Sequence, residues 1–161
     1  MRRVKSLPAV GERMPGFRLP SSDARRVDRD DYRGRHNLVV VFSGGHEEGA
    51  ASALLRKLAS REEDLELERA LVLLVIPRSE AGALAFARRA RLPFSVLADE
   101  SGEAHLAVGA AGPEGELRPA VFVLDRWGTV YARFLPEGEE GWPEAGDILG
   151  WLEYIQIQCP E

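Results

Sequence analysis

The residues best suited to chemistry stand next to one another in a glycine-rich turn that contains Gly44, Gly45, His46, Glu47 and Glu48. Two adjacent glycines can keep backbone N–H groups accessible to an anion where a helix begins, or they can serve only to make the turn. An imidazole beside two carboxylates could bind a metal ion or transfer protons. The turn matches no phosphate-binding motif and its glutamates would repel a phosphate, so we expect no nucleotide there.

A metal site would need more ligands than this turn supplies. The chain has three histidines, His36, His46 and His105, and no two of them have the spacing of metal ligands. A single histidine in a glycine-rich turn is most often polar surface. We therefore expect no metal and no other cofactor. A metal-dependent or acid–base enzyme built on His46 and Glu48 is the weakest of the hypotheses.

Glu47 and Glu48 allow two interpretations. Carboxylates in the first turn of a helix complement the helix dipole, by about 0.3–1 kcal/mol each, and need no further role. Alternatively, the two carboxylates bind a cation or a partner. The first interpretation is favoured.

The single cysteine of the chain, Cys159, precedes Pro160 close to the C-terminus. Without a second thiol it cannot form an intramolecular disulfide. The surrounding sequence offers no charged helix end that would lower the pKa of the thiol, as reactivity requires. We expect an incidental or weakly reactive thiol. Attack on a disulfide or peroxide, or a disulfide between two chains, remains the alternative.

Length and charge limit the remaining functions. A chain of 161 residues, 45% of them hydrophobic, suits one domain with a sizeable core. A net charge of −5 argues against nucleic-acid and anionic membrane surfaces, which need basic patches. No stretch approaches the roughly 20 apolar residues of a membrane helix, and Pro8 and Gly11 interrupt any signal-peptide core. We therefore expect a soluble, cytoplasmic protein that binds neither nucleic acid nor membrane.

The glycine-rich turn lies between a predicted strand and a predicted helix. Residues 38–42 form an unbroken apolar run, typical of a strand that is buried on both faces. From Glu47 on, apolar residues recur every three or four positions, as on one face of a helix. Similar patterns predict a turn at 20–26, one helical turn within 27–34, strands at 71–76, 94–98, 120–124 and 129–135, a helix at 80–90 capped by Ser79, and a last helix from Pro143. This order of elements predicts an α/β fold with a mixed sheet.

Four segments resemble the peroxiredoxin-related AhpC/TSA family: VGERMPGFRLP, DYRGRHNLVVVF, LPFSVLADESGEAHLAVG and RPAVFVLDRWGTVYARF. They occur in the order that the family has, and the resemblance extends over residues 10–152. It implies a thioredoxin-like fold of the peroxiredoxin type, in which helices flank a central mixed β-sheet. We expect residues 1–161 to form one such domain.

The reactive stretch of that family follows a strand and reads Phe-Tyr-Arg-Gly-x-x-Cys-Pro-x-Cys. Aligned without gaps from Phe42, it places its first cysteine at Glu48 and its second at Ala51. The family positions the first thiol at a helix N-terminus, which lowers the pKa of the thiol. The resemblance therefore implies a redox site without its cysteines. This degenerate site comprises Gly44, Gly45, His46, Glu47, Glu48 and Ala51.

A second departure from the family concerns the strand at residues 120–124. Peroxidases of the family hold an arginine six residues before the aspartate that closes this strand, and thioredoxin-like relatives hold a cis-proline there. Counting back from Asp125 reaches Pro119, and Arg118 is one residue out of register. The resemblance therefore implies a cis peptide bond between Arg118 and Pro119.

The leading hypothesis is a peroxiredoxin-related protein that has lost its redox site and acts as a non-catalytic binding or regulatory module. The alternative is an antioxidant or thiol–disulfide oxidoreductase of the AhpC/TSA family that uses Cys159. Whether the chain is an enzyme is thus left open; an active form would be a thiol-dependent peroxidase or disulfide oxidoreductase. Its partner would be an unidentified protein or a small thiol or peroxide. The apolar stretch at residues 151–157 could be a helix that faces the core, or it could contribute to a homodimer.

Overall fold

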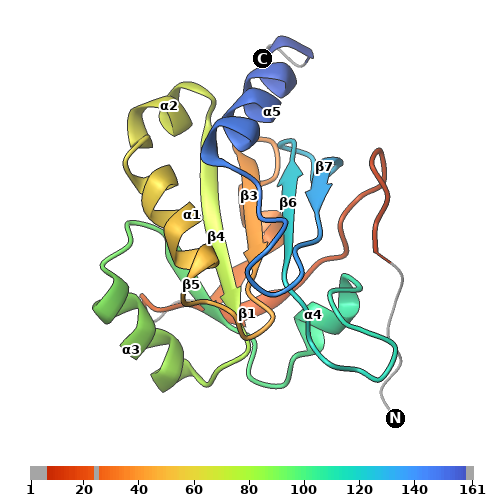
Figure 1. Cartoon of the computed structure of the whole chain (residues 1–161). Helices are drawn as coiled ribbons and strands as arrows, with labels where there is room; N and C mark the ends of the chain where they lie inside the picture. Colours follow the sequence, from red (N-terminus) through yellow and green to blue (C-terminus); the bar gives the residue numbers. More distant parts are fainter. Residues whose placement is uncertain (1–6, 24–25, 159–161) are drawn as a thin grey trace.

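The centre of the fold is a five-stranded mixed β-sheet with the strand order β5-β4-β3-β6-β7 (Figure 1). The computed structural model describes residues 7–23 and 26–158. The strands of the sheet are β3 (Asn37–Phe42), β4 (Ala70–Ile76), β5 (Ser95–Ala98), β6 (Ala120–Leu124) and β7 (Val130–Phe134). β4 is parallel to β3 and β5, whereas β6 is antiparallel to β3 and β7. The predicted α/β fold with a mixed sheet is confirmed.

Helices connect the parallel strands. The helices are α1 (Ala50–Ala59), α2 (Glu62–Leu67), α3 (Glu80–Ala90), α4 (Glu103–Ala107) and α5 (Ala145–Gln158). α1 and α2 follow β3, and α3 follows β4 (Figure 1). α3 has the predicted bounds, and the Ser79 hydroxyl caps it by accepting a hydrogen bond from the Gly82 N–H at 3.1 Å. None of the helices in the described part of the chain combines the length and apolarity needed to cross a lipid bilayer.

β3 is the central strand, and all of its residues are buried. Successive side chains of a strand point to opposite faces of the sheet. On one face, Val39 and Val41 belong to a core that includes side chains of α1, α3 and α5. On the other face, Val40 and Phe42 belong to a second core that includes α4 and the N-terminal segment. Because both faces are covered, residues 38–42 of β3 are all apolar instead of alternating.

Two parts of the chain differ from the prediction. α1 begins at Ala50 rather than at Glu47, because Gly49 has φ 77° and ψ −123°, outside the helical region. The turn expected at residues 20–26 connects β1 (Arg18–Pro20) to β2 (Arg26–Asp28) in a small antiparallel hairpin, and the 3-10 helix η1 (Arg29–Tyr32) lies within the helical turn expected at 27–34. The strand β2 is the part that the sequence did not predict. A strand of three residues, such as β2, is too short to produce a recognisable alternation.

Candidate functional site

The glycine-rich turn follows β3 and lies against the segment that leads into β6. Gly44 has a φ of +58°. A Cβ atom at Gly44 would lie 2.2 Å from the carbonyl carbon of Arg118 and 2.3 Å from the nitrogen of Pro119. Only glycine, which has no side chain, allows two backbones to approach so closely. The structure thus brings together Gly44 and Pro119, two predicted site residues that are distant in the sequence.

The peptide bond between Arg118 and Pro119 is trans. The described residues contain no cis peptide bond, so the expectation of a cis-proline at Pro119 is wrong. The segment before Pro119 is held in place by backbone pairing: the Arg118 N–H donates to the Ala110 carbonyl at 2.9 Å, and Leu117 forms a bridge with Ala111. After Pro119 the chain continues directly into β6.

A buried histidine supports the turn. The Gly44 N–H donates a hydrogen bond to Nε2 of His105 at 3.0 Å, and Nδ1 of His105 lies 2.8 Å from Oδ2 of Asp99. The side chains of His105 and Asp99 are 0% and 1% exposed. Because Nε2 accepts a hydrogen bond, it carries no proton. The imidazole is therefore neutral and donates its Nδ1 proton to Asp99.

Asp99 is held in its charged form. Burial acts to raise the pKa of Asp99, but hydrogen bonds from the His105 side chain and from the N–H groups of Ala104 and His105 outweigh burial. The pKa of Asp99 therefore lies below its ordinary value. The result is a buried chain of hydrogen bonds that runs from a carboxylate through an imidazole to the backbone of the turn.

Glu47 is a second buried group at the turn. Its side chain is 2% exposed, and its carboxylate forms an ion pair with Arg78 and accepts a hydrogen bond from the Ser43 hydroxyl at 3.1 Å. Because α1 begins at Ala50, the expectation that Glu47 and Glu48 lie in the first turn of the helix is wrong. Glu47 instead joins the turn after β3 to the turn after β4.

The two positions that correspond to the family's cysteines differ in exposure. Glu48 is 65% exposed, and its carboxylate pairs with Arg89 of α3 at 2.7 Å. Ala51 lies in the first turn of α1 and is fully buried. Neither side chain contains sulfur, so neither position can carry out thiol chemistry.

A carboxylate from a distant part of the chain occupies the N-terminus of α1. Oε1 of Glu139, in the connection between β7 and α5, accepts a hydrogen bond from the Ala50 N–H at 3.1 Å. A Cβ atom at Gly49 would lie 2.0 Å from the same oxygen, so the glycine makes room for the carboxylate. A helix N-terminus favours a negative charge. In this protein Glu139 supplies that charge.

An open groove of about 450 Å³ lies beside the turn, between His46 and residues 116–119 and 136–138. Gly45 and His46 are exposed. The guanidinium of Arg118 pairs with Glu116 at 3.4 Å. In the described ranges, no three His, Cys, Asp or Glu side chains are placed to share a metal ion. The groups that the groove exposes to a binding partner are therefore backbone N–H and C=O groups, an imidazole, and charges of both signs.

Cys159 lies outside the described residues. The hypothesis that its thiol acts at the turn therefore stays a prediction.

Sequence reasoning does not find four residues that shape the site: Arg78, Asp99, His105 and Glu139. Asp99 precedes α4 and accepts hydrogen bonds from its first turn. A carboxylate just before a short helix is a capping signal. Recognition of Asp99 as such a signal would have drawn attention to His105, which lies six residues after it. Arg78 and Glu139 carry no such signal, because their partners lie 31 and 89 residues away in the sequence.

A mixed sheet with a strand–turn–helix site at the end of its central strand defines a thioredoxin-like protein of the peroxiredoxin type. The sequence matches the AhpC/TSA family over residues 10–133, which is most of the chain. The chain belongs to the AhpC/TSA family, and both the predicted family and the predicted fold are confirmed. The chain contains one cysteine, and the positions of the family's cysteines hold Glu48 and Ala51.

Several solved structures share this fold at low sequence identity. Peroxidoxin BcpB from Mycobacterium tuberculosis has a TM-score of 0.79 at 18% identity, over 92% of this chain and 98% of that one. AhpC of Mycobacterium bovis has a TM-score of 0.81 at 18% identity, over 96% and 95%. The reduced 2-Cys peroxiredoxin of Plasmodium vivax has a TM-score of 0.80 at 14% identity, over 92% and 82%. A comparison with curated proteins gives no match.

Proposed function

We propose that this chain is a non-catalytic binding or regulatory module of the AhpC/TSA family. One observation carries the proposal: the family's two cysteine positions hold Glu48 and Ala51, while a carboxylate of the same chain binds the N-terminus of α1. A peroxidatic thiol reacts as the thiolate, which a free helix N-terminus stabilises. Here the Ala50 N–H is bonded to Glu139, whose negative charge would oppose a thiolate nearby.

The binding face in this proposal is the groove beside the turn. Its floor is fixed by groups that do not depend on a thiol: Gly44 against Arg118 and Pro119, and His105 on the Gly44 N–H. Such a rigid surface suits recognition, because little conformational entropy is lost when a partner binds. We propose an unidentified protein, or a small thiol or peroxide, as the partner, in the cytoplasm.

A homodimer is a second form of this proposal. Trp151, Tyr154 and Ile157 of α5 are 38%, 46% and 66% exposed. Large apolar side chains grouped on one helix are candidates for a protein contact. Sedimentation velocity over a range of concentrations tests this form, and a monomer at every concentration would contradict it.

A peroxide-reduction assay with dithiothreitol as the reductant tests the loss of catalysis. We expect the wild-type chain and the Cys159→Ser variant to consume peroxide equally slowly, near the rate of the reductant alone. The alternative, an oxidoreductase that uses Cys159, predicts turnover in the wild type that Cys159→Ser abolishes. That result would overturn the proposal.

A second experiment distinguishes the effect of the missing thiol from the effect of Glu139 at the N-terminus of α1. We expect Glu48→Cys to introduce a thiol with little reactivity, and Glu48→Cys/Glu139→Ala to give a thiol with a lower pKa, because the helix N-terminus is then free. The pH dependence of alkylation by iodoacetamide measures both. Glu48→Cys/Glu140→Ala is the control, since no hydrogen bond joins the Glu140 side chain to α1 in the described structure. Equal thiol pKa values in all three variants would contradict the role given to Glu139.

A further inference from the structure

Arginine side chains gather where β3 begins, at the end of the sheet opposite the glycine-rich turn. The segment before β3, residues 26–36, lies against residues 125–128, which connect β6 to β7. The Gly34 N–H donates a hydrogen bond to the Arg126 carbonyl at 2.8 Å, and a Cβ atom at Gly128 would lie 2.2 Å from Nη1 of Arg29. Two segments that are distant in the sequence thus form one surface.

Two neighbouring cavities lie on this surface. The larger has a volume of about 410 Å³ and is lined by Arg26, Val27, Asp31, Tyr32, Arg35 and His36. The smaller has a volume of about 10 Å³, roughly that of one water-sized group, and lies between residues 29–38 and 125–128. Tyr32 and His36 line both cavities. We call the two cavities together the arginine pocket.

Three buried nitrogen atoms of the arginine pocket have no hydrogen-bond partner among the described residues. They are Nε of Arg29, Nδ1 of His36 and Nε of Arg126, and all three residues line the smaller cavity. An arginine N–H can only donate a hydrogen bond. A buried donor without a partner is unfavourable, and in a native protein it indicates a bound water or ion. The arginine pocket therefore needs an acceptor from outside the chain.

The charge of the arginine pocket is positive, although the chain as a whole has a net charge of −5. Two aspartates line the pocket, Asp31 and Asp125, and both already accept hydrogen bonds from backbone N–H groups. Five arginines outnumber them: Arg26, Arg29, Arg33, Arg35 and Arg126. Only Arg29 forms an ion pair within the described part of the chain, with Asp30 at 3.3 Å. An anion in the pocket would therefore meet positive charge that the chain leaves uncompensated.

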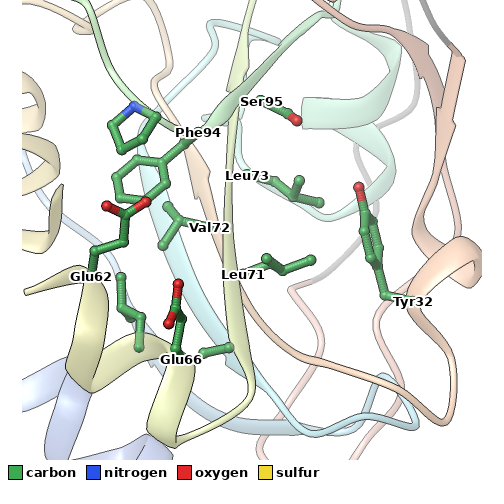
Figure 2. Close-up of a pocket in the computed structure, with 11 residues that line it drawn as sticks. Tyr32, Glu62, Glu66, Leu71, Val72, Leu73, Phe94 and Ser95 are labelled. Atoms are coloured by element: carbon green, nitrogen blue, oxygen red, sulfur yellow. The ribbon is translucent and has the colours of Figure 1, made fainter.

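Tyr32 separates the arginine pocket from a third cavity of opposite character. That cavity has a volume of about 140 Å³ and lies beside β4. Figure 2 shows Tyr32 on the same side of the β4 ribbon as Leu71 and Leu73, and the carboxylates of Glu62 and Glu66 on the other side. Carboxylates repel an anion, so only the arginine side of Tyr32 suits one.

We propose that the arginine pocket binds a small oxyanion of the phosphate class. The anion lies in the larger cavity between Arg26 and Arg35. One of its oxygens enters the smaller cavity, where it accepts hydrogen bonds from the Nε–H groups of Arg29 and Arg126. The planar guanidinium group matches the geometry of phosphate oxygens and binds two of them at once.

The acidic remainder of the chain favours a compact anion over an extended one. A nucleic acid would reach beyond the arginine pocket and meet a protein with more acidic than basic residues. A single phosphate or pyrophosphate group stays within the pocket. The inference does not depend on the proposed function, because the glycine-rich turn lies at the other end of β3.

A titration with sodium pyrophosphate, followed by ¹H–¹⁵N NMR, tests this inference. The control is sodium chloride at the same ionic strength. We expect pyrophosphate, but not chloride, to shift the Gly34 amide and the Nε–H signals of Arg29 and Arg126 in a saturable way, while the Gly45 amide stays unchanged. No saturation at millimolar pyrophosphate, or equal shifts with chloride, would overturn the proposal. Tighter binding of a short single-stranded DNA at the same signals would assign the pocket to nucleic acid and would also overturn it.

Charge variants, measured by isothermal titration calorimetry, locate the binding. We expect Arg26→Gln/Arg35→Gln to weaken pyrophosphate binding at least tenfold, because charge-assisted hydrogen bonds are lost. Both arginines are exposed, so the variant should remain folded. Arg56→Gln/Lys57→Gln is the matched control: it removes two positive charges from exposed positions of α1 that line neither cavity. Its affinity should stay within twofold of the wild type. Equal losses in the two double variants would overturn the proposal, because they would indicate only a general effect of net charge.

Discussion

His105 serves the candidate site as a hydrogen-bond acceptor. Its Nδ1 proton is donated to Asp99, and its Nε2 receives the N–H of Gly44. The same Nε2 cannot both accept this hydrogen bond and carry a proton. The neutral imidazole and the conformation of the turn therefore stabilise each other.

Replacement of Asp99 tests this link. The two carboxylate oxygens of Asp99 accept hydrogen bonds from Ala104 N–H, His105 N–H and Nδ1 of His105. In Asp99→Asn, an amide NH₂ would face one of these donors inside the core. We expect the free energy of unfolding to fall by about 2–3 kcal/mol, measured by urea denaturation at pH 7.

Asp125→Asn is the matched control. Asp125 is also buried, but it accepts from the N–H groups of Trp127 and Thr129 through Oδ1 alone. An amide oxygen can replace that atom, so the loss should stay below about 1 kcal/mol. Equal losses in the two variants would contradict the special role given to Asp99.

The pH dependence of stability should differ between wild type and Asp99→Asn. The pKa of Asp99 is lower in the folded chain than its ordinary value of 3.8. A lowered folded pKa contributes stability that is present above the unfolded pKa and is lost as the pH falls through the folded pKa. We therefore expect the stability advantage of the wild type to shrink as the pH falls below about 4. An advantage that stays constant down to pH 2 would contradict this assignment.

Helices and strands around the site can be predicted from the sequence where a single local sequence pattern determines them. β3 and α3 follow from an apolar run and from a capping serine. The start of α1 is not predictable in this way, because Gly49 leaves the helical region and Glu47 finds a partner in another loop. The family register predicts the site at the turn that follows β3. The contacts of the turn depend on tertiary packing, which no local pattern encodes.

The ion pair of Glu47 and Arg78 joins the turn after β3 to the turn after β4, and its two side chains differ in exposure. Glu47 is 2% exposed, whereas Arg78 is 40% exposed. Arg78→Gln would leave a buried carboxylate without its cation, and we expect a loss of about 2–3 kcal/mol in unfolding free energy. Glu47→Gln leaves an arginine that can reach water, and an amide that still bonds Ser43, so about 1 kcal/mol is expected.

Thermal and urea denaturation of both single variants and of the double variant measure this asymmetry. The double variant should resemble Glu47→Gln, because without the buried carboxylate the arginine has no partner to lose. A larger loss in Glu47→Gln than in Arg78→Gln would contradict the interpretation.

At the scale of the whole molecule, Gly44 fixes the end of the central strand to the start of β6. Its backbone lies where a Cβ atom would overlap Arg118 and Pro119. Gly45, next to it, also has a positive φ, but no atom lies within 4 Å of the position of its Cβ. Both positions require a backbone with positive φ, but only Gly44 also requires the absence of a Cβ atom. A comparison of the two glycines can therefore measure the two effects separately.

Gly44→Ala and Gly45→Ala form a matched pair of variants. Gly45→Ala should cost about 1 kcal/mol, the penalty of a left-handed backbone. Gly44→Ala should cost more than about 3 kcal/mol, because the added methyl group would push two backbone segments apart. Urea denaturation measures both losses, and hydrogen exchange in β6 should increase only for Gly44→Ala. Similar losses in the two variants would show that the close approach contributes little.

The position of β3 also has a consequence for synthesis on the ribosome. β3 pairs with β4 on one side and with β6, whose residues follow some eighty positions later, on the other. Until β6 has left the exit tunnel, the apolar residues 38–42 of β3 have one edge unpaired in the nascent chain. An unpaired apolar edge can pair with other unfolded chains, so we expect β3 to be open to mispairing until most of the chain has been made.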